Sequence, residues 1–542
     1  MDDHQPVRRA PDVPVTRRAF LSAALVGLSP KSANLPTGRF VDPSYEIAHR
    51  WRDGRLRTTA REEHRADVVV VGGGIAGLGA ARRLQSLGLT DVVVLELERD
   101  AGGNARSGEN AVSAYPWGAH YVPVPDTGSA LIRELFRDLG VLAEEGWDDR
   151  ALCFAPQERL FIHGRWQEGL EAQVGPTRRD KDQLARFEDT MRELGATGAF
   201  KVPRERGAGA DTRATRALDD LPMSEWLDRG GWDSPYVRWL VDYACRDDYG
   251  ARPSDVSAWA GVHYFASRTP DDTGPLTWPA GNGWIVNRLL ERVGAMVRTG
   301  ELVVSVERAG NRWTVATERA RWRAAAVVFA APAFLLPFVS DDRLAPALLA
   351  PRDTASPAST GGADAARRAF AQSFTYSPWM TANLTLDRLP VERGFPLAWD
   401  NVIFDSPGLG YVVATHQSLR VHQPRSVWTY YLSLADGSPA ANRQWLLGQS
   451  WETLAGRVLD DLSRAHPDIR ACVSNLDIMR LGHGMVRPTP GFLSSPLRQA
   501  LRDGRQGFFG AHSDVSGLSL FEEAYVGGVR AAERAAAWVG RS

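Results

Sequence analysis

The stretch Val68–Leu78, which reads VVVVGGGIAGL, decides the fold. Its four valines form a β-branched run that is typical of a buried strand. Gly72, Gly74 and Gly77 then follow the pattern G-x-G-x-x-G, which joins a strand to a helix in dinucleotide-binding units. The first glycine permits a tight turn, the second lets the backbone approach a pyrophosphate, and the third lets helix and strand pack closely. The stretch therefore predicts a nucleotide site.

The residues on both sides of the glycine turn complete a βαβ unit. We expect a strand over residues 67–71, a helix through Leu87 and a second strand over residues 92–96. Glu96 ends that second strand about twenty residues past the glycines, where an acid is expected to bind ribose hydroxyls. The free N–H groups at the helix start, at Ile75 and Ala76, would face the phosphates.

Composition and charge narrow the class of protein. The chain has 542 residues, of which 44% are hydrophobic and 24% charged, and a formal net charge of -1. This length exceeds what one hydrophobic core supports, so we expect at least two domains. No block of like charges lies beyond the N-terminus, so the sequence predicts no nucleic-acid partner. Cys153, Cys245 and Cys472 lack metal-ligand spacing, which predicts buried thiols and no metal site.

Residues 1–36 read as an export signal of the twin-arginine type. Arg17 and Arg18 precede Phe20 and a short apolar run that ends near Leu28. The run is too short to span a bilayer. We therefore expect export of the folded protein by the twin-arginine machinery to a periplasmic or extracellular location. There is no clear cleavage site, so the signal could also stay attached as an uncleaved membrane anchor. The alternative interpretation of these residues is a basic tail.

The residues after Glu96 carry a resemblance to a known family. Gly102 and Gly103 follow that acid at the spacing of the Gly-Gly-Arg loop that lies along FAD in the flavin amine oxidase superfamily. This superfamily includes monoamine and polyamine oxidases, protoporphyrinogen oxidase and phytoene desaturases. Asn104 stands where the family has arginine, and Arg106 lies two places further on.

Four later segments resemble the same family. The segment WGAHY, Trp117–Tyr121, is similar to the turn under the flavin ring, and WPAGNG, residues 278–283, to the Pro-x-Gly-Gly stretch. ELVVSVE is similar to the strand that touches adenine, and the C-terminal GAHSDVSG with its following helix to the closing motif. Beyond the residues already named, the resemblance implies cofactor contacts at Gly118, Ala119, His120, Tyr121, Val303, Gly510, His512, Ala524 and Tyr525. His512 replaces the family's acid, for which Asp514 could substitute.

The resemblance implies an α/β fold in which a Rossmann-like FAD-binding domain is interleaved with an α+β substrate-binding domain. The FAD-binding domain is expected over residues 65–125, 276–335 and 471–542, and the substrate domain over residues 126–275 and 336–470. FAD is expected to bind non-covalently, because the C-terminal motif contains no cysteine. Within these ranges we also expect a hairpin around residues 308–312 and a single amphipathic helix over residues 446–462.

The implied chemistry is oxidation of a small-molecule amine by hydride transfer to the flavin, followed by hydrolysis of the imine. Carotenoid or porphyrinogen desaturation, and a non-catalytic flavin-binding scaffold, are the alternatives. None of the lysines Lys31, Lys181 and Lys201 lies in a segment that resembles the one that carries the family's oxygen-associated lysine. This favours an electron acceptor other than O₂, although O₂ is left open.

Candidate catalytic residues are only weakly indicated by the sequence. They are His120 in the flavin turn, His483 just before the last cofactor segment, and Tyr525 in the last helix. Arg487 could bind a carboxylate or form a salt bridge. Further candidates for the pocket wall are Tyr249, His263, Tyr264, Tyr411 and His416, for all of which packing is an equal explanation.

Overall fold

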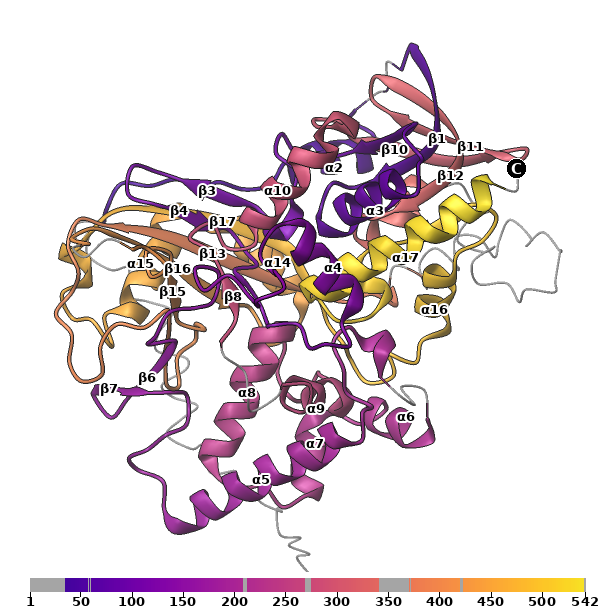
Figure 1. Cartoon of the computed structure of the whole chain (residues 1–542). Helices are drawn as coiled ribbons and strands as arrows, with labels where there is room; N and C mark the ends of the chain where they lie inside the picture. The colour runs from indigo at the N-terminus through magenta and orange to yellow at the C-terminus, as the bar shows by residue number, and fades with distance from the viewer. Residues whose placement is uncertain are drawn as a thin grey trace, which may run out of the picture. The chain divides into compact units, whose positions relative to one another are not determined.

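The fold is built on two large β-sheets (Figure 1). The computed structural model describes residues 35–56, 58, 60–207, 212–268, 274–340, 370, 372–419 and 423–540. The described residues from Pro36 onward belong to one compact unit, to which everything below refers. The predicted export signal, at residues 1–36, falls almost wholly outside the described residues.

The first sheet contains the glycine-turn unit. Its strand order is β10–β11–β12–β1–β2–β9, and β18 pairs beside β12. The bounds are β1 Glu62–Val71, β2 Val92–Leu95, β9 Val297–Arg298, β10 Val303–Ala309, β11 Arg312–Thr317, β12 Ala320–Phe329 and β18 Phe508–Gly510. The sheet is parallel from β12 through β1 and β2 to β9, with Val70 opposite both Val328 and Val94. The predicted hairpin is confirmed by the antiparallel pair β10–β11.

Helices pack against this sheet, and they come from both the N-terminal and the C-terminal parts of the chain. They are α3 (Ile75–Ser86), α4 (Ala130–Asp138), α10 (Gly283–Val293) and α17 (Phe521–Val539). The C-terminal helix α17 runs alongside α3, which follows the glycine turn (Figure 1). The two helices approach so closely that a Cβ on Gly528 would lie 2.1 Å from the Ala76 carbonyl oxygen. Glycine is therefore required at this crossing.

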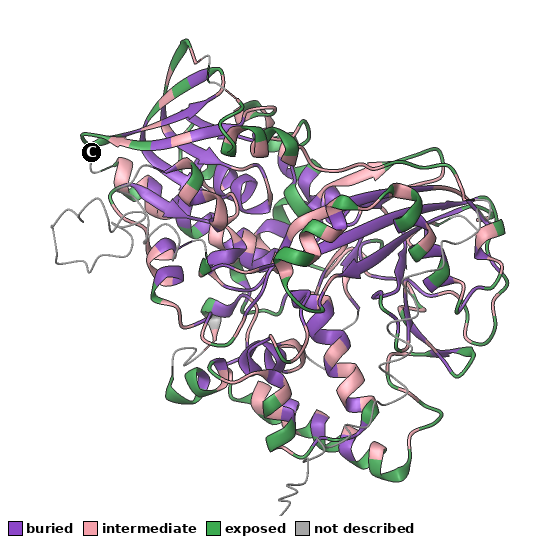
Figure 2. Cartoon of the chain, turned by 180° about the vertical axis from the view of Figure 1, so that it is seen from behind, coloured by how far each residue is buried: buried purple, intermediate pink, exposed green. Residues whose placement is uncertain are grey.

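The second sheet has the order β17–β13–β16–β15–β14–β6–β7 and is mostly antiparallel. The bounds are β6 Glu158–Ile162, β7 Arg165–Glu168, β13 Tyr376–Leu386, β14 Asp400–Ile403, β15 Tyr411–Val413, β16 Ser426–Ser433 and β17 Val473–Val486. Every residue of β13 and β16 is buried (Figure 2), and their buried Ser, Thr and Asn side chains include a hydrogen-bonded pair, Thr429 with Asn383. Two short pairs, β3 (Ser107–Glu109) with β4 (Ala114–Pro116) and β5 (Tyr121–Val122) with β8 (Leu276–Thr277), lie outside the two large sheets.

A group of helices between β7 and β8 completes the substrate region. Its members are α5 (Arg178–Ala196), α6 (Arg213–Asp219), α7 (Met223–Arg229), α8 (Pro235–Tyr249) and α9 (Ala258–Ala266). The remaining helices are α2 (Tyr45–Arg52), α11 (Leu336–Val339), α14 (Pro439–Gly448), α15 (Trp451–Leu462) and α16 (Pro496–Asp503). Across the described residues, no helix combines the length and apolar character that crossing a membrane requires.

Two boundaries differ from the sequence-based expectation. The stretch 471–542 does not lie wholly in the first sheet, because β17 pairs with β13 in the second sheet, and only β18 and α17 join the nucleotide region. The expected helix over residues 446–462 is two helices, α14 and α15. The chain breaks at Gln449, and the Ser450 side chain caps α15 by accepting the Thr453 N–H.

Residues 36–52, the N-terminal strap, join the second sheet to the first. Asp42 forms an ion pair with Arg480 of β17 at 2.6 Å, and both side chains are largely buried. Ser44 donates hydrogen bonds to the Glu98 carboxylate through its backbone N–H and its hydroxyl, at 2.8 and 3.0 Å. Trp51 of α2 then packs against a small apolar cluster around Leu302. The strap therefore ties β17 to the segment that follows the ribose-binding acid.

Replacing Asp42 with asparagine should lower the free energy of unfolding by about 2 to 3 kcal/mol, because a nearly buried arginine loses its carboxylate. Arg480 would keep the carbonyl acceptors at Leu447 and Gln449 and at most one amide oxygen at position 42, without a negative charge. Denaturant unfolding followed by fluorescence measures the change. The control is Asp53→Asn, which removes an exposed ion pair next to Arg52 and should change little. Equal effects of the two substitutions would contradict the bridging role of the strap.

Candidate active site

The glycine turn has the geometry that the sequence predicts. Gly72 has a φ of +101°, a conformation that favours glycine. A Cβ on Gly77 would lie 1.9 Å from the Gly72 carbonyl oxygen, so the third glycine is what allows α3 to start against the turn. Gly74 is the N-cap of α3, whose first residue is Ile75. The free N–H groups of that helix start are available to an anion.

Glu96 is fixed beside this turn. Its carboxylate accepts the Gly73 N–H at 2.6 Å and the Glu98 N–H at 2.8 Å. Burial raises the pKa of Glu96, and the two backbone hydrogen bonds act in the opposite direction. Each carboxylate oxygen has a second lone pair, so the side chain can still accept a hydrogen bond from a hydroxyl group.

Gly102 and Gly103 face the glycine turn from the other side. The Gly102 N–H donates to the Gly73 carbonyl oxygen at 2.8 Å, and both glycines have positive φ, +128° and +57°. A Cβ on Gly103 would lie 3.4 Å from the Cα of Gly74, in the space between the two turns. Arg106 donates to the Gly103 carbonyl oxygen at 3.2 Å and pairs with Glu98 at 3.5 Å, so its role here is to hold the second turn.

The flavin turn is tied to that second turn. The Ala119 N–H donates to the Asn104 carbonyl oxygen at 2.8 Å, and a Cβ on Gly118 would lie 2.3 Å from the same oxygen. Asn282 donates to the Tyr121 carbonyl oxygen at 3.0 Å, whereas its buried Oδ1 has no partner among the described residues. Glycines at two closely packed turns, a buried acid and an unpartnered amide oxygen lie on one path of hydrogen-bonded segments and fit FAD.

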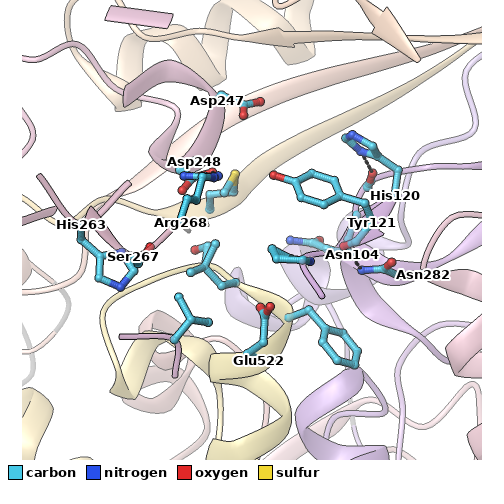
Figure 3. A pocket seen from close by; sticks show the side chains of 18 of the residues that line it. Asn104, His120, Tyr121, Asp247, Asp248, His263, Ser267, Arg268, Asn282 and Glu522 are labelled. Atoms are coloured by element: carbon cyan, nitrogen blue, oxygen red, sulfur yellow. Dashed lines mark hydrogen bonds and ion pairs between the residues drawn. The ribbon is translucent and has the colours of Figure 1, made fainter. Parts of the chain in front are cut away.

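A cavity of about 240 Å³ opens at the end of this path (Figure 3). Its walls come from the second sheet, from the turns at Asn104 and residues 118–121, from the helical group and from the start of α17. The residues that line it include Asn104, His120, Tyr121, Lys201, Asp247, Asp248, His263, Arg268, Asn282, Trp379, Tyr431, Leu520, Phe521 and Glu522. The cofactor turns and the substrate region therefore meet in one space.

The cavity is acidic. Four carboxylate side chains, those of Asp126, Asp247, Asp248 and Glu522, line it against two cationic side chains, those of Lys201 and Arg268. Arg268 lies 3.6 Å from Asp248. Burial raises the pKa of Asp247 to about 7, with a further contribution from the neighbouring Asp248.

The two histidines of the cavity are neutral near pH 7, because burial lowers the pKa of both His120 and His263 to about 4. His120 makes the backbone hydrogen bond that the sequence left open, between Nδ1 and the Gly118 carbonyl oxygen at 3.2 Å. Its ring also stacks on Tyr431 with 4.8 Å between centroids. His263 bonds the Lys201 carbonyl oxygen through Nε2 at 3.1 Å. Histidine therefore adds no positive charge to this cavity.

Two of the three catalytic candidates face elsewhere. The Tyr525 hydroxyl accepts a hydrogen bond from Arg82 at 2.9 Å, and its ring packs on Gly79 of α3. The His483 ring stacks on Phe334 at 4.0 Å, and burial lowers its pKa to about 3. Neither side chain lines the cavity. The structure therefore does not bring His483 and Tyr525 to the cavity with His120, because long-range packing rather than chain position determines where these rings point.

Asp514, which the sequence suggested as a substitute for the acid of the family's closing motif, is buried. Asp514 accepts hydrogen bonds from the Ala333 N–H at 2.8 Å and from the Tyr376 hydroxyl, and it pairs with His512 at 2.9 Å. This network joins η7, the short turn Ser513–Val515, to β13 and to η5, the turn Ala333–Leu335 that follows β12. Its direct role is to hold three segments of the two sheets together.

The remaining predicted site residues lie as follows in the structure. Val303 starts β10 and is buried, Gly510 ends β18, and Ala524 lies in the first turns of α17. The Tyr249 hydroxyl donates to Ala260, Tyr411 contacts Arg159 and His466, and His416 contacts Phe154, so these three serve packing. Tyr264 lies under Arg268, with the guanidinium 3.6 Å from the ring centroid. Arg487 pairs with Asp255 at 2.5 Å.

Sequence reasoning missed several residues of the cavity wall. Asp247, Asp248, Arg268 and Glu522 were not singled out, and Lys201 was considered only because it did not resemble a known position. The signal that could have found the acids is weak, since DD and EE pairs are common on exposed helices. The three cysteines are free and buried, as predicted.

Comparison with known proteins agrees with this geometry. A flavin-containing amine oxidoreductase family model matches residues 75–536. The AofH protein of Mycobacterium tuberculosis, which carries the name flavin-containing monoamine oxidase, is 27% identical over 287 residues. That match covers 49% of this chain and 57% of the relative, so the chain spans about half the length of this curated relative.

Solved structures show the same fold. Putrescine oxidase superposes with a TM-score of 0.66 at 17% identity, covering 88% of this chain and all of that one. Cyclohexylamine oxidase from Brevibacterium oxydans gives a TM-score of 0.64 at 17% identity, covering 88% of this chain and 99% of the other. The fold is therefore the mixed α/β fold of amine oxidases, with FAD-binding and substrate regions. Because the family model spans most of its length, the chain belongs to the flavin-containing amine oxidoreductase family.

Proposed function

We propose that this enzyme oxidises a primary or secondary amine to an imine, which water then hydrolyses. The observation that carries the proposal is the acidic cavity, with four carboxylates against two cations where the cofactor turns meet the substrate region. A wall of this charge attracts an ammonium ion. An apolar polyene or a porphyrinogen would leave those carboxylates desolvated and unpaired, which is costly. Desaturation is therefore less well supported.

The chain's own residues would bind and orient the substrate. The carboxylates of α8 draw the cation inward, and Tyr121, Trp379 and Tyr431 offer aromatic faces to it and to its carbon chain. His120 and His263 stay neutral and do not repel it. The backbone at Gly74 and Gly103 together with Glu96 would hold FAD, which would supply an acceptor for the hydride that leaves the carbon beside nitrogen.

Anaerobic bleaching of the bound flavin tests this proposal. Purified protein is expected to be yellow and to lose its flavin absorbance when mixed with one or more compounds from a panel of monoamines, diamines and polyamines. Amino acids, a polyene and a porphyrinogen complete the panel. Bleaching by the polyene or the porphyrinogen, with none by any amine, would replace amine oxidation with desaturation.

We also propose that FAD is held non-covalently. None of the three cysteines, all of which lie in the described part of the chain, lines the cavity. Acid precipitation should therefore release intact FAD into the supernatant. Flavin that stays with the precipitated protein would show a covalent bond and contradict the proposal.

For the electron acceptor, we propose a molecule other than O₂. The support is the absence of lysine from the segments that resemble the family's oxygen-associated position. Lys201, however, reaches the cavity from the segment between α5 and η3 (Arg204–Arg206). Slow reoxidation of the reduced protein in air, unchanged in Lys201→Met, is the expected result. Fast reoxidation that is lost in Lys201→Met would make the enzyme an oxidase.

We further propose export in the folded state, supported by Arg17 and Arg18 before the short apolar run. Cell fractionation of the wild type and of a variant with both arginines replaced by lysine tests this. The wild type should leave the cytoplasm with FAD bound, and the variant should accumulate inside. Equal distribution of the two would favour a basic tail.

A further inference from the structure

The first turn of α17 carries two adjacent glutamates in different surroundings. Glu522 is 5% exposed and Glu523 is 4% exposed. The Glu523 carboxylate accepts a hydrogen bond from the Arg204 backbone N–H. Glu522 instead lines the cavity, and its carboxylate points into the centre of that space (Figure 3). Two residues that look equivalent in the sequence are therefore distinct in the fold.

The Glu522 carboxylate has no hydrogen-bond partner outside its own residue in the described part of the chain. A buried carboxylate without a partner is costly unless a ligand supplies one. The N-terminus of a 19-residue helix offsets part of that cost, because its dipole favours negative charge in the first turn. This arrangement suits the binding of a cation next to the Glu522 carboxylate.

Other charged groups surround this carboxylate. On its own helix the neighbour is Glu523, and α8 contributes Asp248, while Asp126 and Asp247 line other parts of the same cavity. Arg268 follows α9, and Lys201 precedes η3. Arg268 is shared with Asp248, its closest carboxylate at 3.6 Å, and it donates to the Tyr264 backbone. The acids therefore outnumber the cations around Glu522.

Amine oxidation needs a proton acceptor before the hydride can leave. An alkylammonium ion with a pKa near that of lysine, about 10.4, is almost wholly protonated at neutral pH. Its nitrogen has no free electron pair to stabilise the positive carbon that hydride loss creates. A group in the cavity that removes one proton would make the bound ammonium ion reactive. The two histidines there are too weakly basic to do so, because burial lowers their pKa to about 4.

We propose that Glu522 binds the substrate ammonium and takes its proton, which makes it a catalytic residue; this rests on the proposed amine oxidation. In this step an N–H bond of the ammonium breaks and its electron pair stays on nitrogen. An O–H bond forms on the Glu522 carboxylate, and total charge is conserved. The neutral amine is then held in the cavity with a free electron pair.

The protonation behaviour of Glu522 suits this step. Burial raises its pKa to about 7, the nearby Glu523 and Asp248 add to the rise, and the helix start and Arg268 oppose it. The carboxylate form is therefore present above about pH 7 and disappears below it. A base with a pKa near the working pH is the efficient choice for proton transfer.

The test compares Glu522→Gln with the matched control Glu523→Gln in FAD-loaded protein. Anaerobic flavin reduction by an amine that reduces the wild type is followed across the pH range around 7. The wild-type rate should rise through about pH 7, and Glu523→Gln should keep this rise. Glu522→Gln should lose it and be about a hundredfold slower above pH 7. An unchanged profile in Glu522→Gln would overturn the proposal.

Asp247 is the rival, since its pKa is also raised to about 7. Asp247→Asn should keep the rise in rate. Loss of the rise in Asp247→Asn, together with its retention in Glu522→Gln, would transfer the role to Asp247. Visible spectra and flavin content of each variant show whether the cofactor site has formed.

A binding measurement separates this inference from the proposed function. tert-Butylamine has no hydrogen on the carbon beside nitrogen and cannot be oxidised to an imine. Its affinity for the FAD-loaded wild type, measured by calorimetry, should increase about tenfold as pH rises through 7, and only Glu522→Gln should lose that increase. If no amine reduces the wild type, amine oxidation fails while this measurement still reports on Glu522. If amines reduce the wild type and Glu522→Gln equally at every pH, only the role of Glu522 fails.

Discussion

Gly77→Ala is expected to abolish stable FAD binding. The new Cβ would lie 1.9 Å from the Gly72 carbonyl oxygen and 3.4 Å from Val70, so the turn must move away from α3. Overpacking of this kind costs about 3 kcal/mol, which corresponds to about a hundredfold weaker binding if the original turn must re-form. Flavin content after purification and the concentration dependence of reconstitution with added FAD measure the effect.

Gly456→Ala is the matched control for this substitution. Gly456 also lies inside a helix, α15, but a Cβ there meets no atom within 4 Å. The same change should therefore leave flavin content intact and stabilise the protein by up to about 1 kcal/mol, because alanine favours the helix. Full flavin content in Gly77→Ala would show that the glycine turn is not the cofactor site.

The second large effect is expected for Asp514→Ala, which should lower the free energy of unfolding by about 3 to 5 kcal/mol. The substitution leaves the Ala333 N–H and the Tyr376 hydroxyl without their acceptor inside the protein, and it removes the partner of His512. Thermal unfolding of both proteins, loaded with FAD, measures the loss. Asp189→Ala, which removes an exposed pair with Arg192, is the control and should change little.

The effect of Asp514 should also depend on pH. Burial alone raises the pKa of Asp514, but the hydrogen bonds and charge supplied by His512, Tyr376 and Ala333 outweigh it, so the net pKa is below the ordinary value. A lowered pKa stabilises the folded protein above the ordinary value, near 4, and this contribution is lost as pH falls further. The stability difference between wild type and Asp514→Ala should shrink in that acidic range. A difference that stays constant down to the lowest pH would contradict the ionised network.

Local patterns predicted the nucleotide half of the chain well. The glycine turn, the βαβ unit and the β10–β11 hairpin appear where the sequence places them. Each depends on residues close together in the chain, since glycine spacing sets the backbone dihedral angles and alternation sets strand burial. The substrate half was less predictable. β17 was expected with the nucleotide region, yet its pairing with β13 depends on a partner about a hundred residues away.

The sequence by itself predicted a dinucleotide site at Gly72–Gly77 and determined that the chain resembles the flavin amine oxidases. Only the tertiary structure decided which side chains face the substrate. In the folded chain Glu522 lines the cavity, Glu523 accepts a hydrogen bond from the Arg204 N–H, and Tyr525 accepts one from Arg82. The reason is that the rotation of α17 about its axis is set by close contact with α3 at Gly528, between residues more than four hundred positions apart. No local pattern in the sequence records that contact.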